Sequence, residues 1–317
     1  MCERRTANRQ SIVANGMNRM SRGRRGSESS DPGVTSSRSA DGPALAFAVA
    51  GLVAAASSVA SAALIGLVAF LAVVTVLGAS SAAAQGTSDD IAQRAADPTR
   101  SPLSLQGYAY HTPDVYGVPG SLTQLVFRPV IPYRAFGVDN ILRFTFTYTT
   151  SGPMGRDGLN DLQVLQLSIV ERWGGRFAFG LSGSAPVAAD GLGFERWTIG
   201  PSVGHVTTLE GGVLVGALLQ SFFSVGGSSD PDVAQVAIQP VMAIPFGGGR
   251  TLSLGNAGVV YDAERSRWAS VAPSLQWSWM TSVGGVAVRP QVELTHELRD
   301  LTGSPKTTFR IGAQVLL

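Results

Sequence analysis

From about residue 102 to the end of the chain, apolar and polar side chains alternate with a period of two. In residues 286–297, five apolar side chains would share one face of an extended chain, and five polar or charged ones the other. Successive side chains of a β-strand point to opposite faces, so this spacing predicts a half-buried strand. Residues 142–149 and 308–317 repeat the alternation.

The alternation predicts twelve strands of about ten residues each, the length that a tilted strand needs to cross a bilayer. An even number of antiparallel strands is typical of single-chain outer-membrane barrels. We therefore predict an all-β fold, a transmembrane antiparallel up-and-down β-barrel of about 12 strands over residues 102–317. The strands lie near residues 102–110, 121–132, 140–150, 159–173, 175–187, 195–206, 212–225, 231–244, 250–261, 267–281, 285–298 and 305–317.

The predicted connections alternate between tight turns, such as Gly174-Gly175, and longer polar stretches, such as residues 152–158. Outer-membrane barrels have short turns on one side and longer loops on the other. A soluble periplasmic sandwich or barrel would also alternate, but its water-facing side usually carries many Lys and Glu residues, which are scarce here. The tryptophans also lie at or near predicted strand ends, as interfacial aromatic girdles do: Trp173, Trp197, Trp268, Trp277 and Trp279.

The first 84 residues read as a leader. Residues 42–88 contain no charge, arginines precede them, and Ala82 and Ala84 fit the small-residue rule for cleavage before Gln85. We predict a secretory signal over residues 1–84, with a basic n-region and an apolar h-region, followed by a polar linker over 85–101. The alternative is a retained membrane helix, because the apolar run is long enough to span a bilayer.

Composition supports an exported membrane protein. Only 15% of the 317 residues are charged, and the mean hydropathy is +0.18. Residues 1–84 hold 8 Arg and 4 acidic residues, whereas the remainder holds 16 basic and 18 acidic ones. The nominal pI of 8.9 thus reflects the leader, and we expect no nucleic-acid partner. Cys2, the single cysteine, lies in the leader, so the mature chain would have no thiol chemistry.

Five short segments follow one another along the predicted strands: residues 127–132 (FRPVIP), 158–163 (GLNDLQ), 197–201 (WTIGP), 216–220 (GALLQ) and 232–240 (DVAQVAIQP). In these segments, the chain from about residue 102 resembles a family of bacterial outer-membrane barrels regarded as transporters. That family is also called, misleadingly, bacterial neuromedin U, and it is related to the meta-pathway phenol-degradation barrels. The resemblance implies an outer-membrane barrel that transports small molecules, hydrophobic ones among them.

Catalytic signatures are scarce in the sequence. No zinc-protease motif, P-loop or dinucleotide fingerprint occurs, and the one match to the nucleophile-elbow pattern G-x-S-x-G, residues 200–204 (GPSVG), falls within a predicted strand and not at a strand-to-helix turn. The three histidines, His111, His205 and His296, lack the convergent ligands of a metal site. We predict a non-enzyme without catalytic residues, cofactor or metal. The alternative is a lipid-modifying enzyme using a Ser or His on the outer wall, but His296 and Glu297 would point to opposite faces of one strand.

The polar strand faces suggest where function lies. Charges on a lipid-facing surface cost roughly 2–4 kcal/mol at mid-depth for Arg, so these side chains should face the lumen. We predict that ten of them line a pore: Arg128, Arg143, Gln235, Gln239, Gln276, Arg289, Gln291, Glu293, Arg310 and Gln314. Glu297 would also point inward.

The predicted function is a channel or transporter for passive passage of small molecules in the cell outer membrane. Its partners would be outer-membrane lipids, a small-molecule solute and the barrel assembly machinery. Charged side chains that pair with one another could instead close the lumen and leave a structural barrel. Twelve strands enclose a bore of intermediate size, which the N-terminal segment could obstruct.

Overall fold

The computed structural model describes residues 87–227 and 232–317. The predicted signal sequence, its cleavage site and the alternative of a retained helix lie outside these residues. Within the described ranges, no helix is both long enough and apolar enough to cross a membrane.

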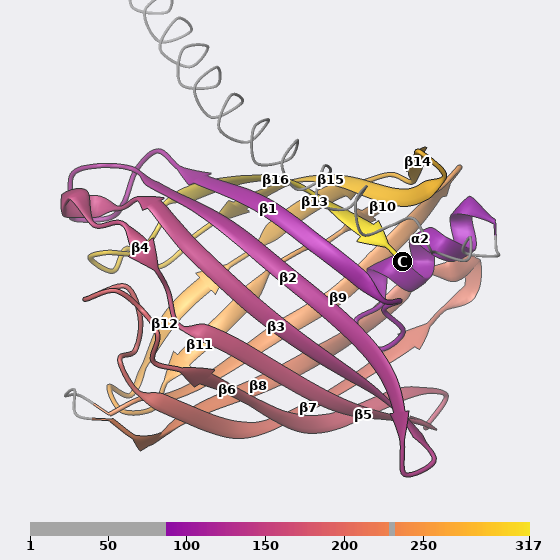
Figure 1. Ribbon diagram of the computed structural model, residues 1–317, viewed down its shortest axis with the longest axis horizontal. Coiled ribbons are helices and arrows are strands. Elements are labelled where there is room, and N and C mark those ends of the chain that lie inside the picture. Colours follow the sequence, from indigo (N-terminus) through magenta and orange to yellow (C-terminus); the bar gives the residue numbers. More distant parts are fainter. Residues whose placement is uncertain (1–86, 228–231) are drawn as a thin grey trace, which may run out of the picture. The chain divides into compact units, whose positions relative to one another are not determined.

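The chain forms one antiparallel β-sheet that closes on itself (Figure 1). Closure occurs where β1 pairs with β16 on one side and with β2 on the other. The strand segments are β1 (Ser104–Thr112), β2 (Leu122–Ala135), β3 (Val138–Ser151), β4 (Gly158–Leu159), β5 (Leu162–Arg172), β6 (Gly175–Ala185), β7 (Trp197–Thr208), β8 (Leu214–Gly226), β9 (Ala234–Gly247), β10 (Arg250–Ser253), β11 (Gly258–Asp262), β12 (Arg267–Ala272), β13 (Ser274–Ser278), β14 (Thr281–Val283), β15 (Val286–His296) and β16 (Thr307–Leu316).

These segments make twelve barrel strands, as the sequence predicts. Both β10 and β11 pair with β9, so they are two halves of one strand. The segments β12, β13 and β14 likewise follow one another along the predicted strand over 267–281. The first break in that strand is at Pro273, which has no N–H to donate to a neighbouring strand.

Register fixes the two faces of the barrel wall, because directly paired residues share a face. Gln106 of β1 pairs with Arg128 of β2 and Gln314 of β16, and these polar side chains point inward. On the outside, Phe127 of β2 pairs with Phe146 of β3, and their rings stack at 6.2 Å. An apolar outer face around a polar interior is the arrangement of a lipid-embedded barrel.

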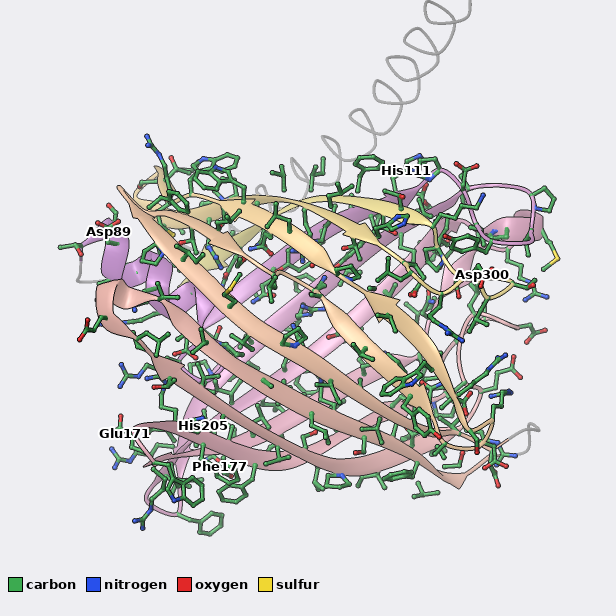
Figure 2. All side chains as sticks on the ribbon, turned by 180° about the vertical axis from the view of Figure 1, so that it is seen from behind. Asp89, His111, Glu171, Phe177, His205 and Asp300 are labelled. Carbon is green, nitrogen blue, oxygen red and sulfur yellow. The ribbon has the colours of Figure 1, made fainter. Side chains whose placement is uncertain are left out.

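The tryptophans lie at strand ends, and four of them are exposed on the surface: Trp173, Trp197, Trp268 and Trp279. Trp277 is half-buried, 5.5 Å from the Phe246 ring. Figure 2 shows Glu171, Phe177 and His205 at one end of the barrel and His111 and Asp300 at the other. The short turns, such as residues 173–174 and 284–285, lie at the first end, and we call it the short-turn end.

The predicted polar linker contains a helix, α2 (Ser88–Ala96), at the short-turn end (Figure 1). The Thr87 side chain caps the helix by accepting a hydrogen bond from the backbone N–H of Asp90. Asp89 and Asp90 occupy the first turn, where carboxylates interact favourably with the helix dipole, and Arg94 pairs with Asp90 one turn later. The expectation of a plain linker misses this capping pattern.

Candidate functional site in the barrel interior

All ten predicted pore residues lie on inward-facing strand positions. Register joins four of the inner positions into one row across neighbouring strands, in the order Arg289, Gln314, Gln106 and Arg128. Gln276 pairs with Glu293, and Glu293 with Arg310, in a second row. Gln291 lies between these rows, on β15.

The other three predicted pore residues lie on β3 and β9. Arg143 pairs with Val130 and Leu165. Gln235 pairs with Phe222, and Gln239 pairs with Leu218.

The positive charge of Arg310 is neutralised by a carboxylate on the neighbouring strand. Arg310 forms a salt bridge with Glu293, and both side chains are less than 5% exposed. The same guanidinium donates to Gln276 and, at 3.4 Å, to Gln291. It also lies 4.6 Å from the centre of the Tyr108 ring. This cluster ties β13, β15, β16 and β1 together across one wall.

Three other inward arginines have no carboxylate partner within salt-bridge distance among the described residues. Arg128 donates to the hydroxyl of Thr145 at 3.3 Å, and Arg143 donates to the side-chain amide oxygen of Gln220, also at 3.3 Å. Arg289 donates to the hydroxyl of Ser278 and to the carbonyl of Ala95 at 2.9 Å each. Neutral acceptors leave these three positive charges uncompensated.

The three arginines line one internal cavity of about 140 Å³. Strands from both sides of the barrel contribute to it, as does the segment that follows α2. Among the described lining residues the single carboxylate is Asp97, which is bound by Arg176. The cavity is therefore positively charged.

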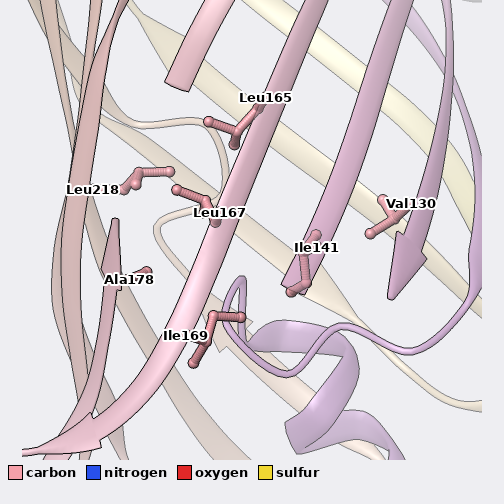
Figure 3. Packing of buried hydrophobic residues seen from close by; sticks show 7 residues of the cluster. All are labelled: Val130, Ile141, Leu165, Leu167, Ile169, Ala178 and Leu218. Carbon is pink, nitrogen blue, oxygen red and sulfur yellow. The ribbon is translucent and has the colours of Figure 1, made fainter. Parts of the chain in front are cut away.

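The wall on one side of this cavity is apolar (Figure 3). Inward-facing aliphatic side chains from β2, β3, β5, β6 and β8 form a buried cluster of Val130, Ile141, Leu165, Leu167, Ile169, Ala178 and Leu218. Sequence reasoning misses this wall because Gln163 and Gln166 of β5 have opposite parity, so β5 shows no clear polar face. Gln166 and Ser168 instead face outward and donate hydrogen bonds to Asn140 at 3.2 and 2.7 Å.

A turn enters the interior where β10 and β11 are separated. Asn256 in this turn donates from its side chain to the hydroxyl of Tyr110, and from its backbone N–H to Glu293, at 2.8 and 2.9 Å. Gln239 donates to the carbonyl of Gly255 at 3.3 Å. Gly255 has φ +59°, a conformation that favours glycine. The predicted continuous strand over 250–261 is thus wrong at residues 254–257, which narrow the bore.

The N-terminal segment closes much of the short-turn end. Asp97 pairs with Arg176 on the inner face of β6, and both side chains are buried. The Arg176 guanidinium also donates to the hydroxyl of Thr99 at 2.8 Å. The carboxylate of Asp89 accepts from the N–H of Gly249 at 2.6 Å, and Gln93 donates to the carbonyl of Gly212 at 3.1 Å. These contacts fasten the segment to the inner face of β6 and to the two neighbouring turns that join β7 to β8 and β9 to β10.

The histidines lie away from this interior. His111, His205 and His296 occupy outward positions on β1, β7 and β15. The His296 ring is hydrogen-bonded to Thr307 at 2.9 Å, whereas the Glu297 carboxylate binds Ser270 and the N–H of Val271. The two therefore form no dyad. The described ranges contain no cluster of His, Cys, Asp and Glu that could hold a metal ion.

No protein-family model matches the chain. No curated protein matches it either. Among solved structures, it is similar to an outer membrane channel from Pseudomonas putida F1, with 14% identity and a TM-score of 0.50. That match covers 68% of this chain and 94% of the channel. An outer membrane phospholipase A from Escherichia coli matches with 14% identity and a TM-score of 0.39, covering 73% and 98% of the two chains.

The similarity to the Pseudomonas channel agrees with the strand topology and the apolar outer face. This chain therefore has the fold of an outer-membrane β-barrel. Membership of the particular transporter family that the sequence motifs resemble stays a prediction.

Proposed function

We propose that the protein is an outer-membrane channel that lets small molecules pass without covalent chemistry and without a cofactor. The observation that carries the proposal is the barrel wall, which is apolar on the outside and presents both polar and aliphatic side chains on the inside, around a cavity with uncompensated arginines. A structural barrel would gain nothing from keeping unpaired charges inside, because buried charges are costly unless they are paired. In a channel, such charges can set which solutes enter.

Orientation follows from the two ends of the barrel. Short turns face the periplasm in outer-membrane barrels, and long loops face outward. The segment of residues 88–101 would then lie at the periplasmic mouth. Outer-membrane lipids would contact the apolar outer face. The alternating C-terminal strand, which includes Phe309, Ile311 and Val315, would be recognised by the barrel assembly machinery.

The proposed passage is narrow. Residues 254–257 fill part of its middle, and residues 88–101 cover much of one end. We expect slow passage in this state and faster passage when the N-terminal segment is displaced. A permanently closed structural barrel is the alternative that this expectation tests.

Liposome swelling tests the proposal. Vesicles containing the full-length protein, with folding verified by heat-modifiable gel mobility, are diluted into isotonic solutions of small sugars, amino acids and organic acids. A channel predicts swelling that slows as solute size increases. Swelling no faster than that of protein-free vesicles, for every solute and also after displacement of the N-terminal segment, would contradict it.

A further inference from the structure

The internal cavity combines positive charge with aliphatic surface. Arg128, Arg143 and Arg289 present positive charge to it, while Val130, Ile141, Leu165, Leu167 and Leu218 present aliphatic surface. Arg289 is 4% exposed and is bound only by neutral acceptors.

Charge and apolar surface are adjacent at Arg143. It pairs with Val130 of β2 on one side and with Leu165 of β5 on the other, and all three side chains face inward. Ile141, two residues earlier on β3, pairs with Leu167. A molecule that touches the Arg143 guanidinium therefore lies against aliphatic side chains as well.

These two surfaces constrain what fits. An inorganic anion would neutralise arginines but leave the aliphatic wall in contact with water. A neutral hydrocarbon would cover the wall but leave the positive charges without a partner, which is costly in a buried site. An apolar body with a single anionic group satisfies both, and guanidinium binds carboxylate through charge-assisted hydrogen bonds.

We propose that the cavity is a binding site for organic monocarboxylates with an apolar body, which are the solutes favoured by this barrel. This inference rests on the proposed channel function and specifies its substrate class. The carboxylate is held by Arg128 and Arg143, and Arg289, at the opposite end of the row that contains Gln314, Gln106 and Arg128, adds positive charge to the same cavity. The hydrocarbon lies along Leu165, Leu167 and Leu218.

The test is calorimetric titration of the full-length protein in phosphatidylcholine nanodiscs, with the signal of empty nanodiscs subtracted. Hexanoate carries both features, acetate carries the charge, hexanol carries the chain, and inorganic phosphate is a second anion. We expect hexanoate to bind at least about tenfold more tightly than each of the other three, about 1.4 kcal/mol. Equal binding of hexanoate and acetate, equal binding of hexanoate and hexanol, or tighter binding of phosphate would each overturn the proposal.

Variants locate the site. Arg143→Met should weaken hexanoate binding about tenfold, because it removes a charge-assisted hydrogen bond, and should leave hexanol binding unchanged. Arg134→Met is the matched control, since Arg134 is exposed at the β2–β3 turn and should have no effect. If Arg143→Met fails to fold by gel mobility, Arg128→Met replaces it. Unchanged hexanoate affinity in a folded Arg143→Met or Arg128→Met protein would overturn the site.

Failure of the binding-site proposal can be distinguished from failure of the channel proposal. Vesicles that swell although the protein binds no hexanoate would leave the channel standing and remove this site. Hexanoate binding without any swelling would leave the site standing and remove passage through the barrel.

Discussion

Two kinds of arginine line the barrel interior, and they should respond differently to substitution. Arg310 is bound to Glu293 in a buried ion pair, whereas Arg128 and Arg143 have only neutral acceptors. Breaking a buried pair leaves one charge uncompensated, which is strongly destabilising. Unpaired arginines act mainly on the electric potential of the bore.

The first prediction concerns the paired arginine. Glu293→Gln should lower the free energy of unfolding by about 3–5 kcal/mol, because Arg310 then stays buried without a carboxylate. Urea unfolding in detergent, followed by tryptophan fluorescence, measures this loss. The double variant Glu293→Gln with Arg310→Met should recover part of it, and a single variant as stable as the wild type would contradict the pairing.

The second prediction concerns the unpaired arginines. Arg128→Glu combined with Arg143→Glu should shift the selectivity of the channel toward cations, since rings of fixed charge set ion preference. The reversal potential across a bilayer under a salt gradient reports this shift. Arg134→Glu introduces an acidic residue at the exposed β2–β3 turn, away from the cavity lining, and serves as the control. An unchanged reversal potential in the double variant would show that ions do not pass these side chains.

At the residue scale, alternation alone assigns the inward side chains, because side-chain direction in a strand has a strict period of two. The partners are less predictable. Gln276, Glu293 and Arg310 meet through register between strands that are distant in sequence. The apolar wall around Leu165 and Leu167 escapes prediction, since lipid-facing and lumen-facing leucines look alike in sequence.

Among the elements, the N-terminal segment makes the most specific contact with the bore. The pair of Asp97 with Arg176 is buried, unlike the nearby pair of Arg100 with Glu171, whose side chains are 53% and 77% exposed. Buried pairs depend strongly on both partners, while exposed ones contribute about 0–1 kcal/mol. Asp97 should therefore govern how firmly this segment is held.

The third prediction follows from that difference. Asp97→Asn should release the segment and increase single-channel conductance or its open time, because Arg176 loses its carboxylate. Planar-bilayer recording of the full-length variant measures the change. Arg100→Gln, in the same segment, should leave the conductance as in the wild type. Identical traces for Asp97→Asn and the wild type would mean that this segment does not obstruct the pore.

The fourth prediction concerns the turn of residues 254–257. A Cβ atom at Gly255 would lie 2.5 and 2.9 Å from the carboxylate oxygens of Glu293, whereas one at Gly248 would meet nothing within 4 Å. Both glycines have φ near +60°, so Gly255→Ala and Gly248→Ala share a conformational cost of about 1–2 kcal/mol. Gly255→Ala should be the less stable of the two in thermal unfolding followed by gel mobility. Equal stability would contradict the inward position of this turn.

At the element scale, the sequence predicts every barrel strand but not the interruptions within three of them, between β4 and β5, between β10 and β11, and along β12, β13 and β14. Pro273 signals one break through its missing N–H. The turn around Gly255 carries no such signal, because glycine is also common in continuous strands of this chain. The α2 helix is too short for clear periodicity, and its capping pattern of Thr87, Asp89 and Asp90 is the signal that could have found it.

At the scale of the whole molecule, twelve strands and both faces of the wall are predictable because they depend on local alternation and strand count. Which segments fill the bore is not predictable from the sequence, because it depends on where residues 88–101 and 254–257 lie relative to strands far away in sequence. A channel function therefore requires passage through a bore that is narrow and positively charged, with residues 88–101 over much of one end.

Single-channel recording of the full-length protein in a planar bilayer under a salt gradient is the most direct test of whether ions pass through the bore. We predict discrete conductance steps with a reversal potential on the anion side, and larger or longer steps for Asp97→Asn. A folded, heat-modifiable barrel that gives no steps in either form would contradict the channel. Steps that favour cations would contradict the role of the unpaired arginines.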